Sequence, residues 1–256
     1  MTRFAASGAT VALVCATRGE VGEISDPNLA TLETLPQVRE EELRCACGHL
    51  GVSDLTFLDY RDSGMADTPE NENPRAFTNI PANKVVPRLV KIIRRLRPQV
   101  VVTFDPTGGY GHPDHIAIHK HTTAAFHAAA DPAQYPNLGQ PWQANKLLYA
   151  VLPRSTFVKM RARMTELELD TTDFDHFLET GVGWPDDEID FTVDVSNAVE
   201  AKWAALICHR TQFGQDSRFR QVFENGSKEL LGREYFVLAW PETDVDLSLD
   251  SIFVKT

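Results

Sequence analysis

Apolar and polar positions alternate along the chain in a way that predicts strands and helices in turn. Short apolar runs have the length of strands; they cover residues 10–16, 55–58, 99–104 and 146–152. The first run is also rich in β-branched residues, which predicts a strand buried on both faces. Segments with helical spacing lie between them, at residues 36–50, 82–97 and 114–130. This alternation predicts an α/β fold, a Rossmann-like sandwich with a mostly parallel central sheet.

The two ends of the chain shape the expected domain. Further along, residues 189–195 are typical of a strand, 196–209 of a helix, and the acidic tail 243–256 of an edge strand or a frayed end. We expect a single domain over residues 1–256, with a core at 1–152 and a C-terminal elaboration at 153–256. The opening MTRFAAS has the pattern of a helix end, so we expect the first βα unit to be truncated.

Charge and cysteine content narrow the class of protein. A formal net charge of -11, without a long cluster of Lys or Arg, argues against nucleic acid as a partner. No apolar run is long enough for a membrane span, and we expect a cytoplasmic protein. Cys15, Cys45, Cys47 and Cys208 are interpreted as buried structural thiols rather than as a cysteine zinc site, since Cys45 and Cys47 point to different helix faces.

Three motif-like polar loops each follow a predicted strand, at residues 17–23, 59–65 and 105–115. The carboxyl ends of parallel strands meet at one edge of an open α/β sheet, and ligands bind there. We therefore expect these loops to form one shared site rather than separate turns.

The third loop, DPTGGYGHPDH, carries the most specific pattern. Its glycines permit positive φ angles and close backbone approach, and Pro113 favours a helix start. A glycine turn before an exposed helix would explain the glycines. It would not explain His112, Asp114 and His115, which bring acid–base and metal-ligand chemistry into four residues.

These loops resemble motifs of the PIG-L/LmbE-like deacetylases. The similar segments are TRGEVG at 17–22, RDSGM at 61–65 and the loop at 105–115, within a match over at least residues 1–130; HRTQ at 209–212 is compatible. The resemblance implies a metal-dependent hydrolase that removes an acetyl group from an N-acetylglucosamine-containing molecule or hydrolyses a related amide. It also implies one Zn²⁺ ion, which acidifies a bound water.

The resemblance implies a role for particular residues. His115 corresponds to a metal ligand, and His112 to the histidine that stabilises the tetrahedral intermediate or protonates the leaving amine. Asp114 would orient His112, and Tyr110 would help polarise the acetyl carbonyl.

Two further residues are implied to bind substrate. Arg39 and Asp62 match positions that hold sugar hydroxyls. From the residues alone, Arg39 and Glu40 to Glu42 would lie on a solvated charged helix face. His209 is either a site residue from the C-terminal half or an ordinary helix-end histidine, and His49 carries no motif.

One part of the family pattern is missing. The family's other ligands and its general base lie in a His-Pro-Asp-Asp-Glu motif, which this sequence lacks. We expect an upstream extension to supply it, and we expect impaired activity without it, because a lone His115 does not hold zinc against water. An improvised site of His115 and His119 with His112 or Asp105 is the alternative; otherwise His119, His121 and His127 are surface or packing residues.

Other functions stay open at this stage. The same fold would serve a non-catalytic pseudoenzyme or sugar-binding protein, and a nucleotide-binding module would use the glycines around a phosphate, although their spacing is not that of the dinucleotide fingerprint. The sequence does not determine which N-acyl substrate is cleaved or whether the chain forms a homo-oligomer. Iron or cobalt would also suit such a metal site.

Overall fold

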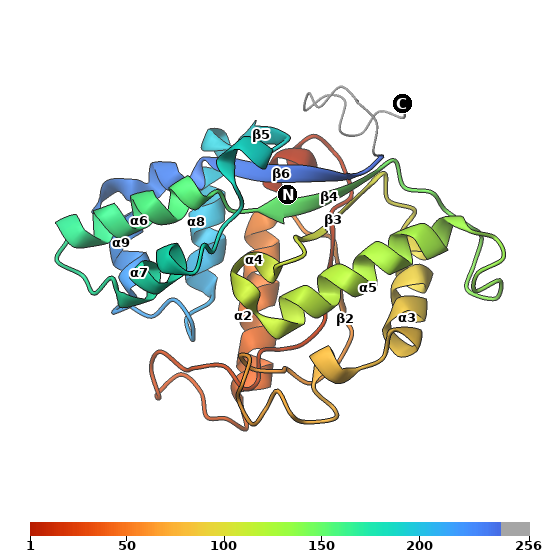
Figure 1. Ribbon diagram of the computed structural model, residues 1–256, viewed down its shortest axis with the longest axis horizontal. Helices are drawn as coiled ribbons and strands as arrows, with labels where there is room; N and C mark the ends of the chain where they lie inside the picture. Colours follow the sequence, from red (N-terminus) through yellow and green to blue (C-terminus); the bar gives the residue numbers. More distant parts are fainter. Residues whose placement is uncertain (242–256) are drawn as a thin grey trace.

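A computed structural model describes residues 1–241, and its first part follows the expected alternation (Figure 1). After a short helix α1 (Thr2–Ala6), the elements are β1 (Ala12–Cys15), α2 (Leu35–Leu50), β2 (Asp54–Phe57), α3 (Ala82–Leu96), β3 (Val100–Phe104), α4 (Gly108–Gly111), α5 (Pro113–Ala130) and β4 (Lys146–Val151). Each predicted strand and helix before residue 152 is confirmed to within a few residues.

Local sequence explains where these helices begin and end. α2 carries a proline in its first turn and stops at Gly51, whose φ of 73° gives the left-handed C-cap that glycine favours. α3 ends at Arg97, directly before Pro98. α5 begins with Pro113 after His112 as its N-cap.

The C-terminal part was only half predicted. It contains α6 (Arg154–Glu166), α7 (Thr172–Glu179), β5 (Phe191–Asp194), α8 (Val199–Cys208), α9 (Arg218–Val222) and β6 (Arg233–Trp240). The expected strand at 189–195 and helix at 196–209 correspond to β5 and α8, whereas α6, α7, α9 and β6 were not foreseen. In Figure 1, α6 to α9 gather at one end of the molecule and α3 and α5 at the other. The tail at 243–256 lies outside the described residues.

The sheet differs from the single, mostly parallel one expected. Among residues 1–241, β1 pairs with β2 in a parallel two-stranded sheet, and a separate sheet has the order β3-β4-β6-β5. In that second sheet β3 and β4 are parallel, but β6 runs antiparallel to both β4 and β5. The predicted α/β fold is confirmed, but the mostly parallel sheet only in part, because β6 returns from the C-terminal helices in the reverse direction, which helical and strand periodicity alone do not reveal.

β1 was predicted to be buried on both faces, but none of its residues is fully buried, and β3 is partly exposed too. The ladder partner of β3 in the described chain is β4 alone, and Val102 and Phe104 keep 51% and 37% of their surface exposed. Most of the buried apolar residues gather instead in the two largest of four clusters. One joins α3 to α5, and the other lies among α6, α7, α8 and α9.

Candidate active site

The glycine–histidine loop, residues 105–115, is organised from within by Asp105. Its Oδ1 accepts hydrogen bonds from the Thr107 N–H at 2.7 Å and the Thr107 hydroxyl at 2.5 Å, and its Oδ2 accepts one from the Gly109 N–H at 3.1 Å. Asp105 is only 2% exposed. Because both of its oxygens hold the turn, Asp105 acts as a loop organiser in this structure.

Gly108 lets the loop approach helix α5. Its φ of 68° is in the left-handed region, and a Cβ there would lie 2.9 Å from both the His115 Cβ and the Ile116 nitrogen. The Gly108 carbonyl oxygen lies 3.1 Å from His115 Nδ1. A carbonyl can only accept, so His115 donates from Nδ1 and its Nε2 carries the free lone pair.

His115 is thereby oriented as a metal ligand would be. Its ring stacks on Phe104 with centroids 3.9 Å apart, and burial lowers its pKa to about 4, which keeps the imidazole neutral. A neutral ring anchored through one nitrogen presents the other to a metal ion. The structure thus gives the predicted ligand a suitable tautomer.

His112 and Tyr110 stand beside His115. Ring centroids are 4.9 Å apart for His112 and His115, and 5.2 Å apart for Tyr110 and His115. His112 Nδ1 accepts from the main-chain N–H of Asp114 at 3.1 Å, so a neutral His112 carries its proton on Nε2. Burial lowers the pKa of His112, whereas Tyr110 keeps 43% of its surface exposed. The cluster offers an N–H donor and a phenol beside the free nitrogen of His115.

Asp114 contacts His112 through its main chain. Its main-chain N–H holds His112, while its carboxylate Oδ2 accepts from the Ser63 N–H at 3.3 Å. The other oxygen, Oδ1, is buried without a hydrogen-bond partner. Burial first, and the nearby Asp62 carboxylate in addition, raise the pKa of Asp114 to about 7.

Asp62 fastens the loop after β2 to the loop after β1. Its carboxylate accepts from the Val21 N–H at 3.2 Å and the Gly64 N–H at 3.0 Å, and its own N–H donates to Glu20 at 2.9 Å. Through the contact between Ser63 and Asp114, the third loop joins them. The three loops that sequence placed at one edge do meet in the structure.

Arg39 of α2 lies inside the first of these loops. Its guanidinium donates to the carbonyls of Gly19 at 2.5 Å and Glu23 at 2.8 Å, and its Nε is buried without a partner. A Cβ at Gly19 or Gly22 would fall 2.4 Å from Arg39 Nη1. Burial lowers the pKa of Arg39. Arg39 therefore shapes the loop, and its role toward a sugar hydroxyl stays a prediction.

Sequence reasoning missed Glu42. It was assigned to a solvated face, but it is 3% exposed, and its two carboxylate oxygens accept from the N–H and the hydroxyl of Thr211, each at 2.8 Å. Thr211 is fully buried, directly beyond α8. The helical spacing of α2 places Glu42 one turn from Arg39, but only the fold brings residue 211 there. His209 lies near this carboxylate, and its pKa is lowered mainly by burial.

The cysteine prediction needs correcting for two of the four residues. Cys45 of α2 and Cys208 of α8 form a disulfide across 163 positions of sequence, and Cys45 is exposed rather than buried. Helical packing of α2 against α8 brings the two Cα atoms to 5.9 Å, a separation that spacing along the chain cannot reveal. Cys15 and Cys47 are free thiols, as expected, and burial raises the pKa of Cys15 to about 11.

The residues around His115 do not complete a zinc site. Within residues 1–241, the group of three metal-ligating side chains with converging ligand atoms is Cys45, His49 and Cys208, not a set that includes His115. The ligand atoms of His119, His112 and Asp105 do not converge with that of His115 among the described residues, and Asp105 holds its own turn, so the improvised site is not formed. His115 alone supplies fewer than the three protein ligands that catalytic zinc uses.

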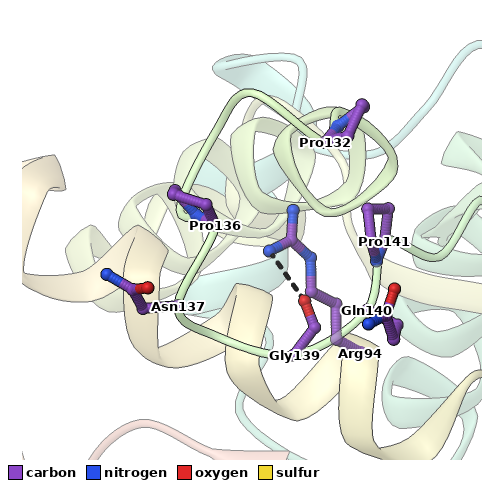
Figure 2. A pocket seen from close by; sticks show the side chains of 7 residues that line it. All are labelled: Arg94, Pro132, Pro136, Asn137, Gly139, Gln140 and Pro141. Atoms are coloured by element: carbon purple, nitrogen blue, oxygen red, sulfur yellow. Dashed lines mark hydrogen bonds between the residues drawn. The ribbon is translucent and has the colours of Figure 1, made fainter.

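A pocket beside the loop at 131–141 is lined by Arg94 and by residues of that loop (Figure 2). Arg94 reaches into it from α3 and donates to six main-chain carbonyls, those of Ala128, Ala129, Asp131, Gln134, Tyr135 and Gly139. Since the guanidinium of Arg94 is hydrogen bonded to these carbonyls, Arg94 holds the loop in place and is not available to bind an anion in the pocket.

Sequence comparison places the chain in a family. Residues 1–126 match the PIG-L family, described as GlcNAc-PI de-N-acetylase. A 1D-myo-inositol 2-acetamido-2-deoxy-alpha-D-glucopyranoside deacetylase from Geodermatophilus obscurus is 40% identical over 250 residues, with 93% of this chain and 85% of the relative covered. The enzyme of the same name from Thermobifida fusca is 41% identical over 249 residues, with the same coverage. The chain belongs to the PIG-L family, as the motifs predicted.

Solved structures agree on the fold. The N,N'-diacetylchitobiose deacetylase from Pyrococcus horikoshii superimposes with a TM-score of 0.62 at 19% identity, covering 93% of this chain and 75% of that one. A 4-carboxy-2-hydroxymuconate hydratase from Pseudomonas putida gives 0.59 at 18% identity, covering 96% and 91%. These proteins are named for different reactions, so the shared fold does not by itself determine the chemistry.

Within residues 1–241, no helix combines the length and the apolar character that a membrane crossing needs.

Proposed function

We propose that this chain is an N-deacetylase of an N-acetylglucosaminyl inositol or a closely related N-acetylated amino-sugar conjugate. The observation that carries the proposal is the cluster of Tyr110, His112 and His115, held where the three loops meet. Relatives near 40% identity over most of the chain are named for deacetylation of that inositol glycoside, which supports the substrate class.

The chain's own residues suit amide hydrolysis. We propose that the Nε2–H of neutral His112 donates a hydrogen bond to the tetrahedral intermediate, or that His112, once protonated, gives a proton to the leaving amine, and that the Tyr110 hydroxyl donates to the acetyl oxygen. Asp114 holds His112 through its main-chain N–H, and its unpartnered oxygen is a further site for a proton. Asp62 and Arg39 would act on the sugar through the loop that they hold, in addition to any direct contact.

We include zinc in the proposal with one protein ligand, His115. The Nε2 of His115 would hold the ion, and the resemblance to the family supports this role. Because one imidazole is an incomplete set of ligands, we expect impaired turnover from residues 1–256 alone. We further propose one domain over residues 1–256 and a cytoplasmic location; self-association is left to measurement.

The test is release of primary amine from 1D-myo-inositol 2-acetamido-2-deoxy-alpha-D-glucopyranoside in the presence of Zn²⁺. Residues 1–256 should be assayed alone and after fusion to an upstream segment that carries a His-Pro-Asp-Asp-Glu motif. We expect His115→Ala to lower kcat/KM by about 100-fold or more in whichever form turns over, because metal affinity and activity fall together. His127→Ala, an exposed histidine on the same helix, is the matched control and should leave kcat/KM unchanged.

Turnover that survives His115→Ala would overturn the assignment of the site. Turnover by residues 1–256 alone, with stoichiometric metal bound, would contradict the expected loss of activity.

The incomplete donor set at His115 also favours a second candidate, a sugar-binding protein without catalysis. It predicts binding of the same glycoside in calorimetry with no amine released by either form. A nucleotide-binding function gains no support, because the loop N–H groups of Thr107 and Gly109, which would cradle a phosphate, already donate to Asp105.

A further inference from the structure

Three metal-ligating side chains converge where α2 meets α8, away from the glycine–histidine loop. Cys45 and His49 lie four residues apart on one face of α2, and Cys208 is the last residue of α8. Their ligand atoms all lie within 4.8 Å of one another. Sulfur and imidazole nitrogen are the ligands that Zn²⁺ prefers in proteins.

We propose that this trio is a redox-gated zinc site: the Cys45–Cys208 disulfide closes it, and reduction opens it to one Zn²⁺ bound by Cys45, Cys208 and His49. The Cα atoms of the two cysteines are 5.9 Å apart, which suits a disulfide. Tetrahedral zinc places two sulfur ligands about 3.8 Å apart, given a Zn–S distance near 2.3 Å. That separation needs side-chain rotation rather than movement of the helices.

The surroundings favour a cation. α2 ends at Leu50 and α8 at Cys208, so His49 and Cys208 lie in the last turns of two helices, near their negative dipole ends. The neighbouring cation Arg44 is engaged by Glu40 at 2.7 Å. Cys45 and His49 are exposed, which gives an ion an entry path and leaves a fourth position for water.

The chemistry balances with a dithiol as the reductant. The dithiol passes two electrons and two protons to the disulfide and becomes a disulfide itself, which leaves two thiols on the protein. Zn²⁺ then binds both sulfurs and the imidazole of His49, and two protons are released to solvent. In the reverse direction a disulfide oxidant takes two electrons from the two thiolates and, with two protons from solvent, becomes a dithiol; the Cys45–Cys208 bond reforms and Zn²⁺ is released, so disulfide and metal exclude one another.

The site would couple redox state to the junction between the two halves of the chain. Glu42 lies one turn before Cys45 on α2, and Thr211 lies three residues after Cys208, and these two are hydrogen bonded. Ala46, Ala205 and Cys208 pack together in the same contact. Either the disulfide or the zinc ion would tie α2 to α8.

Co²⁺ binding tests the proposal, because a thiolate ligand gives cobalt a charge-transfer absorption that histidine and carboxylate ligands do not. The full chain is reduced with dithiothreitol, freed of it by gel filtration under nitrogen, and titrated with Co²⁺. We expect one equivalent to develop the thiolate band, Zn²⁺ to abolish it, and the oxidised chain to show none. Cys45→Ser and Cys208→Ser should lose the band, and His49→Ala should weaken binding at least about tenfold.

Two controls separate this site from others. Cys47→Ser, on the same helix but with a free thiol, should keep the band, and so should His115→Ala, which makes the result independent of the proposed deacetylase activity. A band in the oxidised chain, or one that survives Cys45→Ser, would overturn the proposal.

If Cys208→Ser does not fold, alkylation of the wild-type chain followed by mass spectrometry tests whether zinc binds at this site. Zn²⁺ should protect Cys45 and Cys208 from alkylation, and this protection should be lost in His49→Ala. Equal labelling of Cys45 with and without zinc would also overturn the site.

Discussion

The glycine–histidine loop and the α2–α8 junction (Glu42, Cys45, Cys208 and Thr211) both combine buried and exposed residues, but they use their polar groups differently. In the loop, Nε2 of His115 and Oδ1 of Asp114 are left without a protein partner by the contacts that orient them. In the junction, both oxygens of Glu42 are taken by Thr211, and the two sulfurs by each other.

This difference distinguishes a region that can carry out chemistry from a region that holds two parts of the fold together. Groups with unused bonding capacity in a fixed orientation can bind a metal or move a proton, whereas satisfied groups add stability and hold two parts together. Variants of the junction should therefore change unfolding more than variants of the loop do.

The largest effect on stability is expected from Glu42→Ala. It leaves the N–H and hydroxyl of the buried Thr211 without an acceptor, and hydrogen bonds to a charged group contribute about 1.5 to 3 kcal/mol each, so we expect a loss of about 4 kcal/mol. Urea unfolding should show a lower midpoint at an unchanged m-value. Glu41→Ala, at the exposed neighbouring residue, is the control. Equal stabilities for the two variants would mean that the hydrogen bonds between Glu42 and Thr211 do not stabilise the fold.

The disulfide comes next. Cys45→Ser should lower the free energy of unfolding of the oxidised protein by about 3 kcal/mol, since the cross-link closes a long loop of 163 positions in the unfolded chain. With a dithiol and a chelator present, wild type and variant should differ by less than about 0.5 kcal/mol, because neither disulfide nor metal then joins the helices. A difference that persists under those conditions would assign the effect to packing of Cys45.

Within the loop, Gly108 and Gly109 make a matched pair. Gly108→Ala combines a positive φ with contacts of 2.9 Å to His115 and Ile116, and we expect a loss of about 3 kcal/mol. Gly109 has a φ of 77° but open space around its Cβ position, so Gly109→Ala should cost only about 1 kcal/mol. Thermal unfolding of both variants measures the difference, and equal costs would mean that close approach to His115 does not matter.

The smallest effect is expected at the rim of the junction. Arg44→Ala removes an i,i+4 ion pair with Glu40 in which the arginine side chain is 56% exposed, so we expect a loss of about 0.5 kcal/mol or less. Repeating the urea unfolding in 1 M salt should remove most of that loss. A larger effect that is insensitive to salt would point to stacking of Arg44 over Phe57, where the distance is 5.6 Å.

Local sequence determined the elements of the first half and the composition of the loop. Apolar periodicity, Pro36, Gly51 and Pro98 fix where α2 and α3 begin or end, because these effects act within a few residues. The glycines and histidines of residues 105–115 are contiguous, so their chemistry could be read before any fold was known, and the family resemblance that they carried is confirmed.

Only the tertiary structure decided the rest. Burial of Glu42, the pairing of Cys45 with Cys208 and the antiparallel course of β6 depend on residues far apart in sequence, and no local pattern encodes which distant segments will pack together. The same holds for the tautomers of His112 and His115, which follow from their hydrogen-bond partners in the folded loop. The sequence identified the reactive groups, and packing determined which of them have an atom without a hydrogen-bond partner.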